Sequence, residues 1–228
     1  MSWGNINKKP LSNNKFTYTP SENKNQQNHQ NQAIKYTGSI MKSEFAIMHC
    51  SLSDDYEKIL KGGCIYLPNY FCATDNTIIF ENLKKEIDFN GMVNWSKHFK
   101  HENPTFSKTF NEIVDKMANH FNVEVIQTRL NYYKNGTDWK PMHKDRHAYG
   151  EGNDKIREDF TMGASFGSSR NIDFLHEESN MKFTFPQNNG DIFAFNSEIN
   201  KKFLHGIPKV FKPINERFSI IAWGKQKN

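Results

Sequence analysis

The sequence predicts an α+β, mainly β domain: a double-stranded β-helix, or jelly roll, buttressed by N-terminal helices. Two observations support this prediction. Apolar residues recur at helical spacing between residues 74 and 121, whereas after Phe121 they follow the two-residue period of strands. The strand-like segments are short and separated by turn residues such as Lys134-Asn135-Gly136, which is typical of sheets packed face to face.

The chain begins with a polar segment, residues 1–40, that is predicted to be a disordered tail. It is rich in Asn, Gln, Lys and Ser, so ordering it would not bury enough apolar surface to offset the lost entropy. An alternative is that part of it folds on a partner. The domain is expected to occupy residues 41–228, with order beginning near Phe45.

The first elements are a short strand and two helices. Residues 63–71 form a predicted strand that Pro68 stops, and Thr74 or Asp75 is a candidate cap for the following helix. A second helix is expected over 105–121, and residues 89–104 between the helices are expected to form an exposed loop near a site. The apolar faces consist of Ile78, Ile79, Leu83 and Ile87 in the first helix and Phe106, Phe110, Ile113, Val114 and Met117 in the second.

Strands are predicted over the rest of the chain. Alternation of Met181, Phe183 and Phe185 indicates a sheet with one buried face. The seven predicted strands are 123–133, 160–166, 171–175, 181–185, 191–195, 203–208 and 217–223.

Charge and composition exclude some classes of protein. The net charge is +5, but residues 1–40 hold five Lys against one Glu, so the domain is nearly neutral and global basicity is weak evidence for a polyanion partner. With no apolar run of about 18 residues, we expect no membrane span. The absence of a signal-like apolar stretch and the three cysteines without CxxC spacing predict an intracellular protein, cytoplasmic or nuclear.

A candidate metal site begins with His143-Lys144-Asp145. On an extended segment the first and third side chains leave the same face and can converge on one ion. His205 lies in a later strand, and two His with one carboxylate match the facial triad of non-haem Fe(II) oxygenases. The alternative is a surface His-x-Asp together with an unrelated buried His.

Arg217 is a candidate anion-binding residue. It starts an apolar strand, residues 217–223, so its side chain is expected to be drawn inward, where an Arg needs an anion. A dicarboxylate ligand would satisfy it. The alternative is an internal ion pair with Asp or Glu.

Taken together, these residues resemble the signature of the AlkB-like Fe(II)/2-oxoglutarate dioxygenases, with similarity from about Ile65 to Trp223. The resemblance implies Fe(II), 2-oxoglutarate as cosubstrate and dioxygen. It also implies three catalytic iron ligands, His143, Asp145 and His205, and three residues that bind 2-oxoglutarate, Asn131, Tyr133 and Arg217.

The implied activity is oxidative demethylation of N-methylated bases in nucleic acid, RNA or DNA. The alternatives are a hydroxylase or demethylase of a protein or small molecule on the same fold, or a non-enzymatic metal-binding jelly-roll protein. The sequence does not decide the oligomeric state.

Two departures from the family pattern concern the cosubstrate and specificity. Trp223 stands where the family often has a second Arg, and His147 stands where bacterial repair members have an acidic residue that reads a cationic base. Unless Glu151 or Asp154 replaces the missing carboxylate, the expected substrate is neutral, such as N6-methylated adenine, or is not a base at all. The candidate substrate residues are Arg146, His147 and Tyr149.

Overall fold

The computed structural model describes residues 63–227, apart from residues 96, 146–157, 179 and 181. The predicted tail and the predicted start of order near Phe45 lie outside the described residues. The first elements in chain order are β1 (Cys64–Leu67), α3 (Ile78–Glu86), η1 (Phe89–Gly91), β2 (Val93–Asn94), β3 (Phe99–Glu102), α4 (Lys108–Phe121) and β4 (Val123–Tyr133). The remaining elements are β5 (Lys140–His143), β6 (Phe160–Gly167), β7 (Arg170–His176), β8 (Lys182–Gln187), β9 (Ile192–Asn196), α5 (Ser197–Lys202), β10 (Phe203–Ile207) and β11 (Arg217–Gln226).

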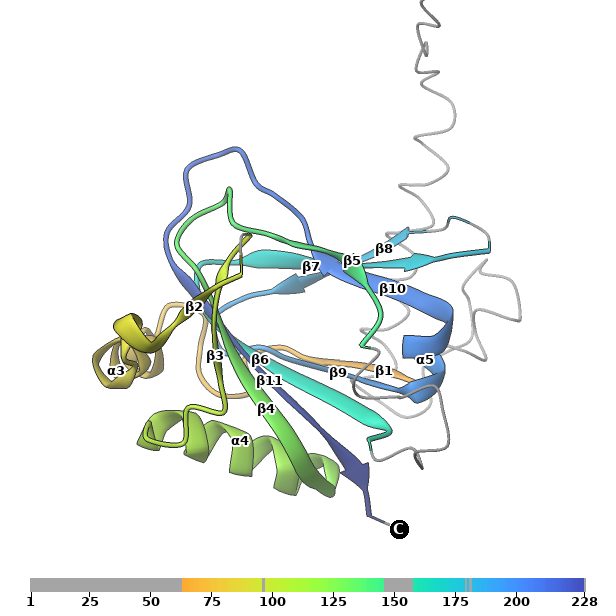
Figure 1. Cartoon of the computed structure of the whole chain (residues 1–228), viewed down its shortest axis with the longest axis horizontal. Helices are drawn as coiled ribbons and strands as arrows, with labels where there is room; N and C mark the ends of the chain where they lie inside the picture. Colours follow the sequence, from red (N-terminus) through yellow and green to blue (C-terminus); the bar gives the residue numbers. More distant parts are fainter. Residues whose placement is uncertain (1–62, 96, 146–157, 179, 181, 228) are drawn as a thin grey trace, which may run out of the picture.

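Two antiparallel sheets face each other (Figure 1). The larger sheet has seven strands in the order β1-β9-β6-β11-β4-β3-β2, and the smaller has four in the order β5-β10-β7-β8. Strands adjacent in the chain often lie in different sheets, as β9 and β10 do. This arrangement confirms the predicted jelly roll with helices before it.

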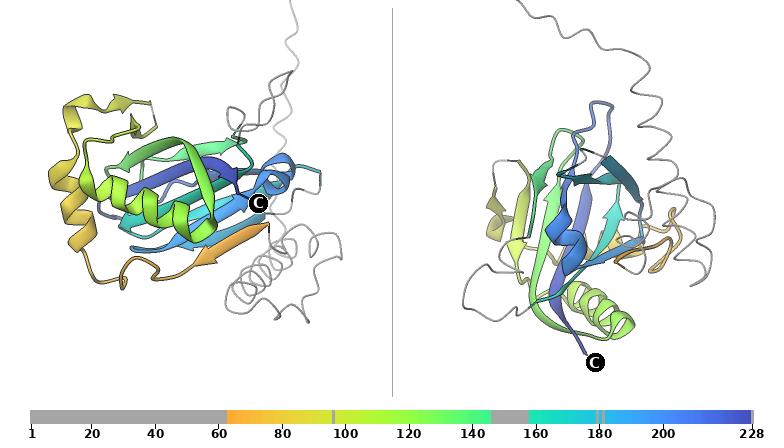
Figure 2. Two further views of the ribbon diagram at one scale, coloured as in Figure 1. Left: turned by 90° about the horizontal axis from the view of Figure 1, so that it is seen from below. Right: turned by 90° about the vertical axis from the view of Figure 1, so that its right-hand side faces the viewer.

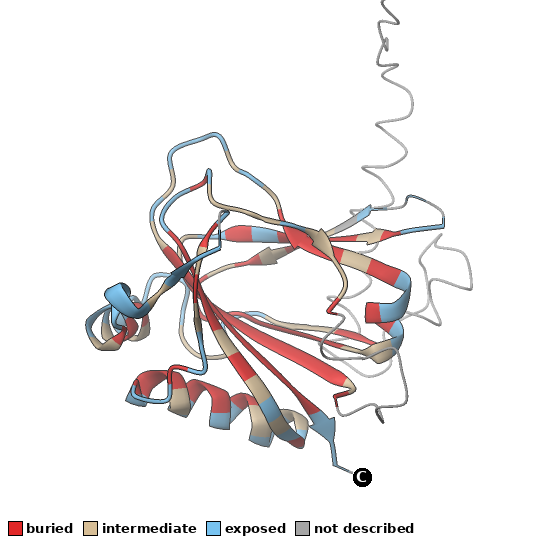
Figure 3. Cartoon of the chain, viewed as in Figure 1, coloured by how far each residue is buried: buried red, intermediate tan, exposed pale blue. Residues whose placement is uncertain are grey.

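The helices α3 and α4 cover the outer face of the larger sheet (Figure 2). Along β4 and β11, alternate residues such as Leu130 and Ile220 join the core beneath these helices. Their neighbours Asn131 and Ser219 therefore face the smaller sheet, as the two-residue period of a strand requires. Buried residues run along most of β6 and of the central strand β11 (Figure 3).

The first helix differs from its prediction at its start. Its N-cap is Thr77, without a side-chain capping bond, rather than Thr74 or Asp75. Ile78 is 65% exposed because it opens the helix on the solvent side, and Phe80 is buried in its place. No helix in the described part of the chain is long and apolar enough to cross a membrane.

The second helix starts later than predicted, because Ser107 caps it and accepts a hydrogen bond from Phe110 N at 3.1 Å. Phe106 therefore precedes the helix and is 56% exposed, outside the predicted apolar face.

The prediction of a loop over residues 89–104 is wrong. This segment contains η1, β2 and β3, and β3 pairs with β4 from Phe99 opposite Tyr132 to Glu102 opposite Arg129. The polar side chains of β3 give no strand pattern, because the strand is specified by backbone pairing with β4 on one side and β2 on the other. The sequence pattern also does not predict β5, a four-residue strand that contains Pro141.

Candidate metal centre and its cavity

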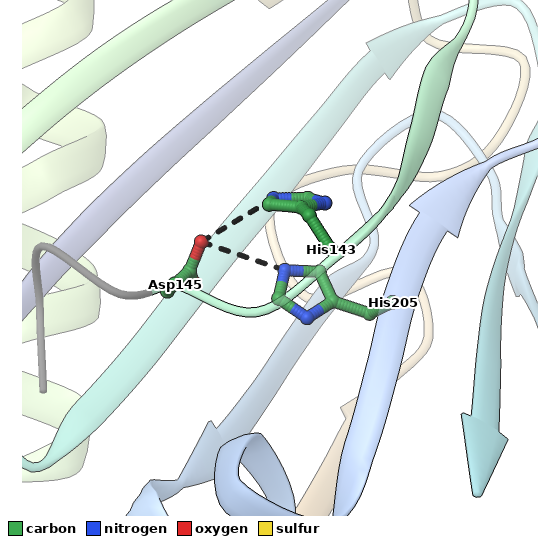
Figure 4. Close-up of side chains that lie close together, drawn as sticks. All are labelled: His143, Asp145 and His205. Atoms are coloured by element: carbon green, nitrogen blue, oxygen red, sulfur yellow. Dashed lines mark ion pairs between the residues drawn. The ribbon is translucent and has the colours of Figure 1, made fainter. Parts of the chain in front are cut away.

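The three predicted iron ligands meet between the sheets. His143 ends β5 and lies directly opposite His205 of β10, so their side chains leave the same face of the smaller sheet. Asp145 follows β5 by two residues. One ligand atom from each of the three residues lies within 4.8 Å of the other two (Figure 4).

The position of Asp145 is fixed from two sides. Its backbone N–H donates to Oδ1 of Asn200, in α5, at 3.0 Å. Its carboxylate Oδ2 accepts a hydrogen bond from the indole Nε1 of Trp223 at 2.9 Å. The other oxygen, Oδ1, faces both imidazoles, 3.4 Å from His143 Nε2 and 3.6 Å from His205 Nε2.

The ring of His143 is held in the orientation of a metal ligand. Its Nδ1 lies 2.9 Å from the carbonyl oxygen of Pro141, which fixes the N–H on that nitrogen when the ring is neutral. Nε2 then presents a lone pair toward Asp145 Oδ1, and it has no hydrogen-bond partner among the described residues. Two electron-pair donors that face one another in a buried site fit a cation between them.

Electrostatics support the same protonation states. Burial lowers the pKa of His143, against an opposing effect of Asp145, so the neutral ring is favoured at pH 7. Burial by itself raises the pKa of Asp145, but His205, His143 and Lys140 outweigh it and hold the pKa well below its ordinary value. A carboxylate and a neutral imidazole are two of the three donors of a facial-triad metal site.

A second feature of the site is the Arg217 guanidinium, at the start of β11 and against the ring of the cavity residue Tyr133. Arg217 is only 1% exposed, and its Nε donates to Ser165 Oγ at 2.9 Å. Both terminal nitrogens are buried without a hydrogen-bond partner among the described residues. Burial lowers the pKa of Arg217 to about 10, so the group stays cationic at pH 7. A buried guanidinium with two free donor groups fits an anionic ligand.

Asn131 and Tyr133 lie beside this guanidinium on β4. Tyr133 pairs with Arg217 across the sheet, and the guanidinium carbon lies 5.1 Å from the centre of the Tyr133 ring. The ring of His98 stacks on that of Tyr133, nearly parallel to it, at a centroid distance of 5.1 Å. His98 Nε2 also lies 3.2 Å from Asn131 Oδ1, so the residue just before β3 helps to fix this end of β4.

One cavity joins the two ends. Its lining includes Asn131 and Tyr133, the ligands Asp145 and His205, and Lys140. Burial lowers the pKa of Lys140 to about 8, partly offset by Asp145. The structure thus brings all six predicted metal and cosubstrate residues to one region between the sheets.

Three further residues contribute to the site: Trp223 through Asp145, His98 through Asn131, and Lys140 in the lining. For Trp223, the sequence signal is its position six residues after Arg217. For His98 and Lys140, the sequence gives no signal beyond their closeness along the chain to predicted site residues. The predicted substrate residues Arg146, His147 and Tyr149 lie outside the described residues.

Comparison with solved structures finds proteins that share this fold. The chain superposes on a Pseudomonas putida prolyl-4-hydroxylase with a TM-score of 0.53 at 11% identity, covering 75% of this chain and 97% of that one. A 2OG-Fe(II) oxygenase family oxidoreductase from Burkholderia pseudomallei gives 0.53 at 14% identity, over 79% and 94% of the two chains. OsALKBH1 gives 0.50 at 11% identity, over 72% and 97%.

Sequence comparison finds fewer similar proteins than structure comparison. No family model matches the chain. An uncharacterized protein of Acanthamoeba polyphaga mimivirus is 31% identical over 102 residues, which cover 45% of this chain and 50% of that protein. The match therefore spans about half the length of that relative.

The fold is that of the 2-oxoglutarate-dependent Fe(II) oxygenases, and the residues between its sheets fit such an enzyme's needs. The His143, Asp145 and His205 group fits a metal ion, and the free donors of Arg217 fit a carboxylate.

Proposed function

We propose that this protein is an Fe(II)/2-oxoglutarate-dependent dioxygenase that oxidatively demethylates N-methylated bases in nucleic acid. The observation that carries the oxygenase assignment is the pairing of two incomplete sites in one cavity. His143, Asp145 and His205 present three metal donors, and Arg217 has two buried terminal nitrogens that donate to no described residue. A metal chelated by a dicarboxylate completes both.

The geometry of the metal donors suits this role. A first-row ion about 2.1 Å from each of three mutually adjacent ligands holds the ligand atoms about 3.0 Å apart. The imidazole nitrogens are 3.4 Å and 3.6 Å from Asp145 Oδ1, so a small contraction accommodates the ion. Three coordination positions then remain for cosubstrate and dioxygen.

The chemistry supplied by bound iron and 2-oxoglutarate is the insertion of one oxygen atom of O₂ into a C–H bond. The other oxygen atom enters succinate as 2-oxoglutarate loses carbon dioxide. Hydroxylation of an N-methyl group gives an unstable N-hydroxymethyl product, which releases formaldehyde and leaves the unmethylated base. The sheets exclude water from this reaction, and the chain's polar residues orient the cosubstrate.

A surface beside the cavity supports nucleic acid as the substrate. We call it the tryptophan–lysine rim: Trp95 with Lys100, and Trp139 with Lys97 and Lys209. The ammonium of Lys100 lies 3.5 Å from the centre of the Trp95 ring, and those of Lys97 and Lys209 lie 5.6 Å and 5.3 Å from that of Trp139. Trp95 is 56% exposed. Aromatic rings among cations are the elements that bind single-stranded nucleic acid.

The rim borders the cavity through the backbone. His98 Nδ1 contacts the carbonyl oxygen of Trp139, and Trp139 immediately precedes Lys140 of the lining. A base flipped from a strand bound on the rim would have a short path to the metal.

Succinate release tests the enzyme class first. The full chain with Fe(II), ascorbate and 2-oxoglutarate is expected to form succinate, and Asp145→Asn is expected to form none. A protein that binds metal but never turns over cosubstrate, with or without added substrates, would instead be a non-enzymatic metal-binding protein.

Formaldehyde release then tests the substrate. Methylated single-stranded RNA and DNA are compared with methylated peptides, and each oligonucleotide carries either a cationic or a neutral methylated adenine. We expect release from nucleic acid, with the neutral base preferred, and a loss of affinity in Trp95→Ala. Efficient turnover of the cationic base would contradict the predicted preference.

A second candidate is hydroxylation of a protein or small molecule. The near-neutral charge of residues 41–228 favours it, and one of the similar solved structures is a prolyl-4-hydroxylase. Cosubstrate turnover that peptides stimulate and nucleic acids do not would establish this alternative.

A further inference from the structure

Lys140 faces the cavity because β5 is irregular. His205 of β10 pairs with His143 of β5, and Ile207 of β10 pairs with Lys140 of β5. The two pairs are therefore two residues apart on β10 but three residues apart on β5. Residues three apart on a regular strand point to opposite faces. The additional residue in β5 therefore turns Lys140 to the same side as the metal ligand His143, in the manner of a β-bulge.

The ammonium of Lys140 is the one cationic Lys or Arg group among the described residues that line this cavity. No described carboxylate forms an ion pair with it. Glu102, which lies in its electrostatic environment, already pairs with Lys100 and Arg129. Asp145 attracts Lys140, but its two oxygens face Trp223 and the imidazoles. A half-buried cation in such a place needs an anion from outside the protein.

Arg217 and Lys140 have different electrostatic surroundings. The electrostatic partners of Arg217 are Tyr133 and Arg170, whereas those of Lys140 are Asp145, Arg129, Glu102 and Lys100. The first group surrounds the free guanidinium, and the second includes the metal ligand. Under the proposed function, 2-oxoglutarate binds with its distal carboxylate at Arg217 and its keto-acid end at the metal.

β11 offers no cationic side chain to the keto-acid end of 2-oxoglutarate. Trp223, on the cavity face of that strand, gives its one N–H to Asp145. We propose that Lys140, from the opposite sheet, binds the carboxylate next to the keto group of 2-oxoglutarate. This inference rests on the proposed function and assigns the residue that completes its cosubstrate site.

The test compares two ligands that differ only at the distal end. 2-Oxopentanoate has the keto-acid end of 2-oxoglutarate but no distal carboxylate. Binding of each ligand to protein loaded with Mn(II) under anaerobic conditions is measured by calorimetry for wild type, Lys140→Met, Lys140→Arg and Arg217→Met. Lys144→Met is the matched control, because Lys144 pairs with Glu177 instead.

We expect Lys140→Met to weaken both ligands by a similar factor of tenfold or more, since a charge-assisted hydrogen bond is lost from each. Arg217→Met should weaken 2-oxoglutarate alone. Lys140→Arg should recover most of the affinity for both ligands, and Lys144→Met should bind as wild type. If Lys140→Met does not fold, Lys140→Gln replaces it in the same comparison.

Three results would overturn the inference. Unchanged affinity of Lys140→Met for both ligands would show that Lys140 serves another purpose. A loss confined to binding of a methylated oligonucleotide would assign Lys140 to a substrate phosphate. If wild-type protein with Mn(II) bound neither keto acid, the proposed function itself would fail, which the first two results do not imply.

Discussion

The two ends of the cavity are built in different ways. Arg217 lies on β11, which pairs along most of its length with both β4 and β6, in a sheet that two helices cover. His143 ends β5, a four-residue strand at the edge of the smaller sheet, and Asp145 stands just beyond it. The anion end is thus part of the core, whereas the metal end is assembled at a margin.

The difference indicates which end is preformed. Core packing holds Arg217 in place at the cost of burying an unpartnered cation, and an arriving carboxylate recovers that cost. The metal end has its ligands close together, but their final separation depends on the ion itself. Variants at the two ends should therefore fail in distinguishable ways.

Removing a metal ligand should have the largest effect. His143→Ala is expected to abolish Mn(II) binding and all turnover, because two protein ligands cannot hold the facial site. Its metal-free thermal unfolding should match that of wild type, since His143 lies at a sheet edge. The control is His120→Ala on the surface of α4. Retention of one tightly bound ion would contradict the assignment.

Removing the Arg217 guanidinium should weaken cosubstrate binding without changing metal affinity. Arg217→Met is expected to weaken 2-oxoglutarate binding by about 3–5 kcal/mol, the usual effect of truncating one member of a buried charged pair. Mn(II) affinity should not change, and metal-free stability should fall little, because the substitution removes a buried charge that has no anionic partner among the described residues, although it also removes the hydrogen bond to Ser165.

Arg170→Met is the matched control for that variant. Its guanidinium donates to the carbonyl oxygens of Asn135, Asp138 and Pro208, so the substitution should destabilise the fold. Equal destabilisation by both substitutions would show that Arg217 is a structural residue.

Acid should weaken the anion end through His98. Burial, together with Lys140, lowers the pKa of His98 to about 4, below its ordinary value of 6.5. The unfolded chain therefore binds this proton more readily, and stability is lost as pH falls from 6.5 to 4. The shift corresponds to about 3 kcal/mol. Urea unfolding of metal-free wild type and His98→Asn should show this loss in wild type, and parallel pH profiles would refute it.

The smallest expected effect concerns the connection between the ends. Trp223 belongs to the core strand β11 but holds the carboxylate of Asp145, so Trp223→Phe should weaken Mn(II) binding about 10- to 100-fold. Trp139→Phe is the control. Unaltered metal affinity in Trp223→Phe would show that Asp145 needs no support from the larger sheet.

The sequence predicts much of this site because strand periodicity carries the information. Spacing two residues apart predicted that His143 and Asp145 converge, and the structure brings them together with His205. Asn131 and Tyr133 were expected from the family resemblance, and both line the cavity. The jelly roll and its leading helices followed from the same periodicity.

Long-range and irregular features escape that reasoning. The contact between Trp223 and Asp145 joins residues 78 positions apart, and no local pattern encodes it. The orientation of Lys140 depends on a break in the register of β5, a strand too short to show a period. β3 is specified by pairing with β4 rather than by its own side chains.

The indole of Trp223 gives the protein a built-in optical reporter. It is fully buried, and its N–H contacts a metal ligand directly, so an ion that withdraws charge from Asp145 alters the indole's emission. The sequence has only four Trp residues, so this signal is a sizeable share of the total. Fluorescence can thus follow the arrival of Co(II) at the triad within one mixing experiment, without a label or a turnover assay.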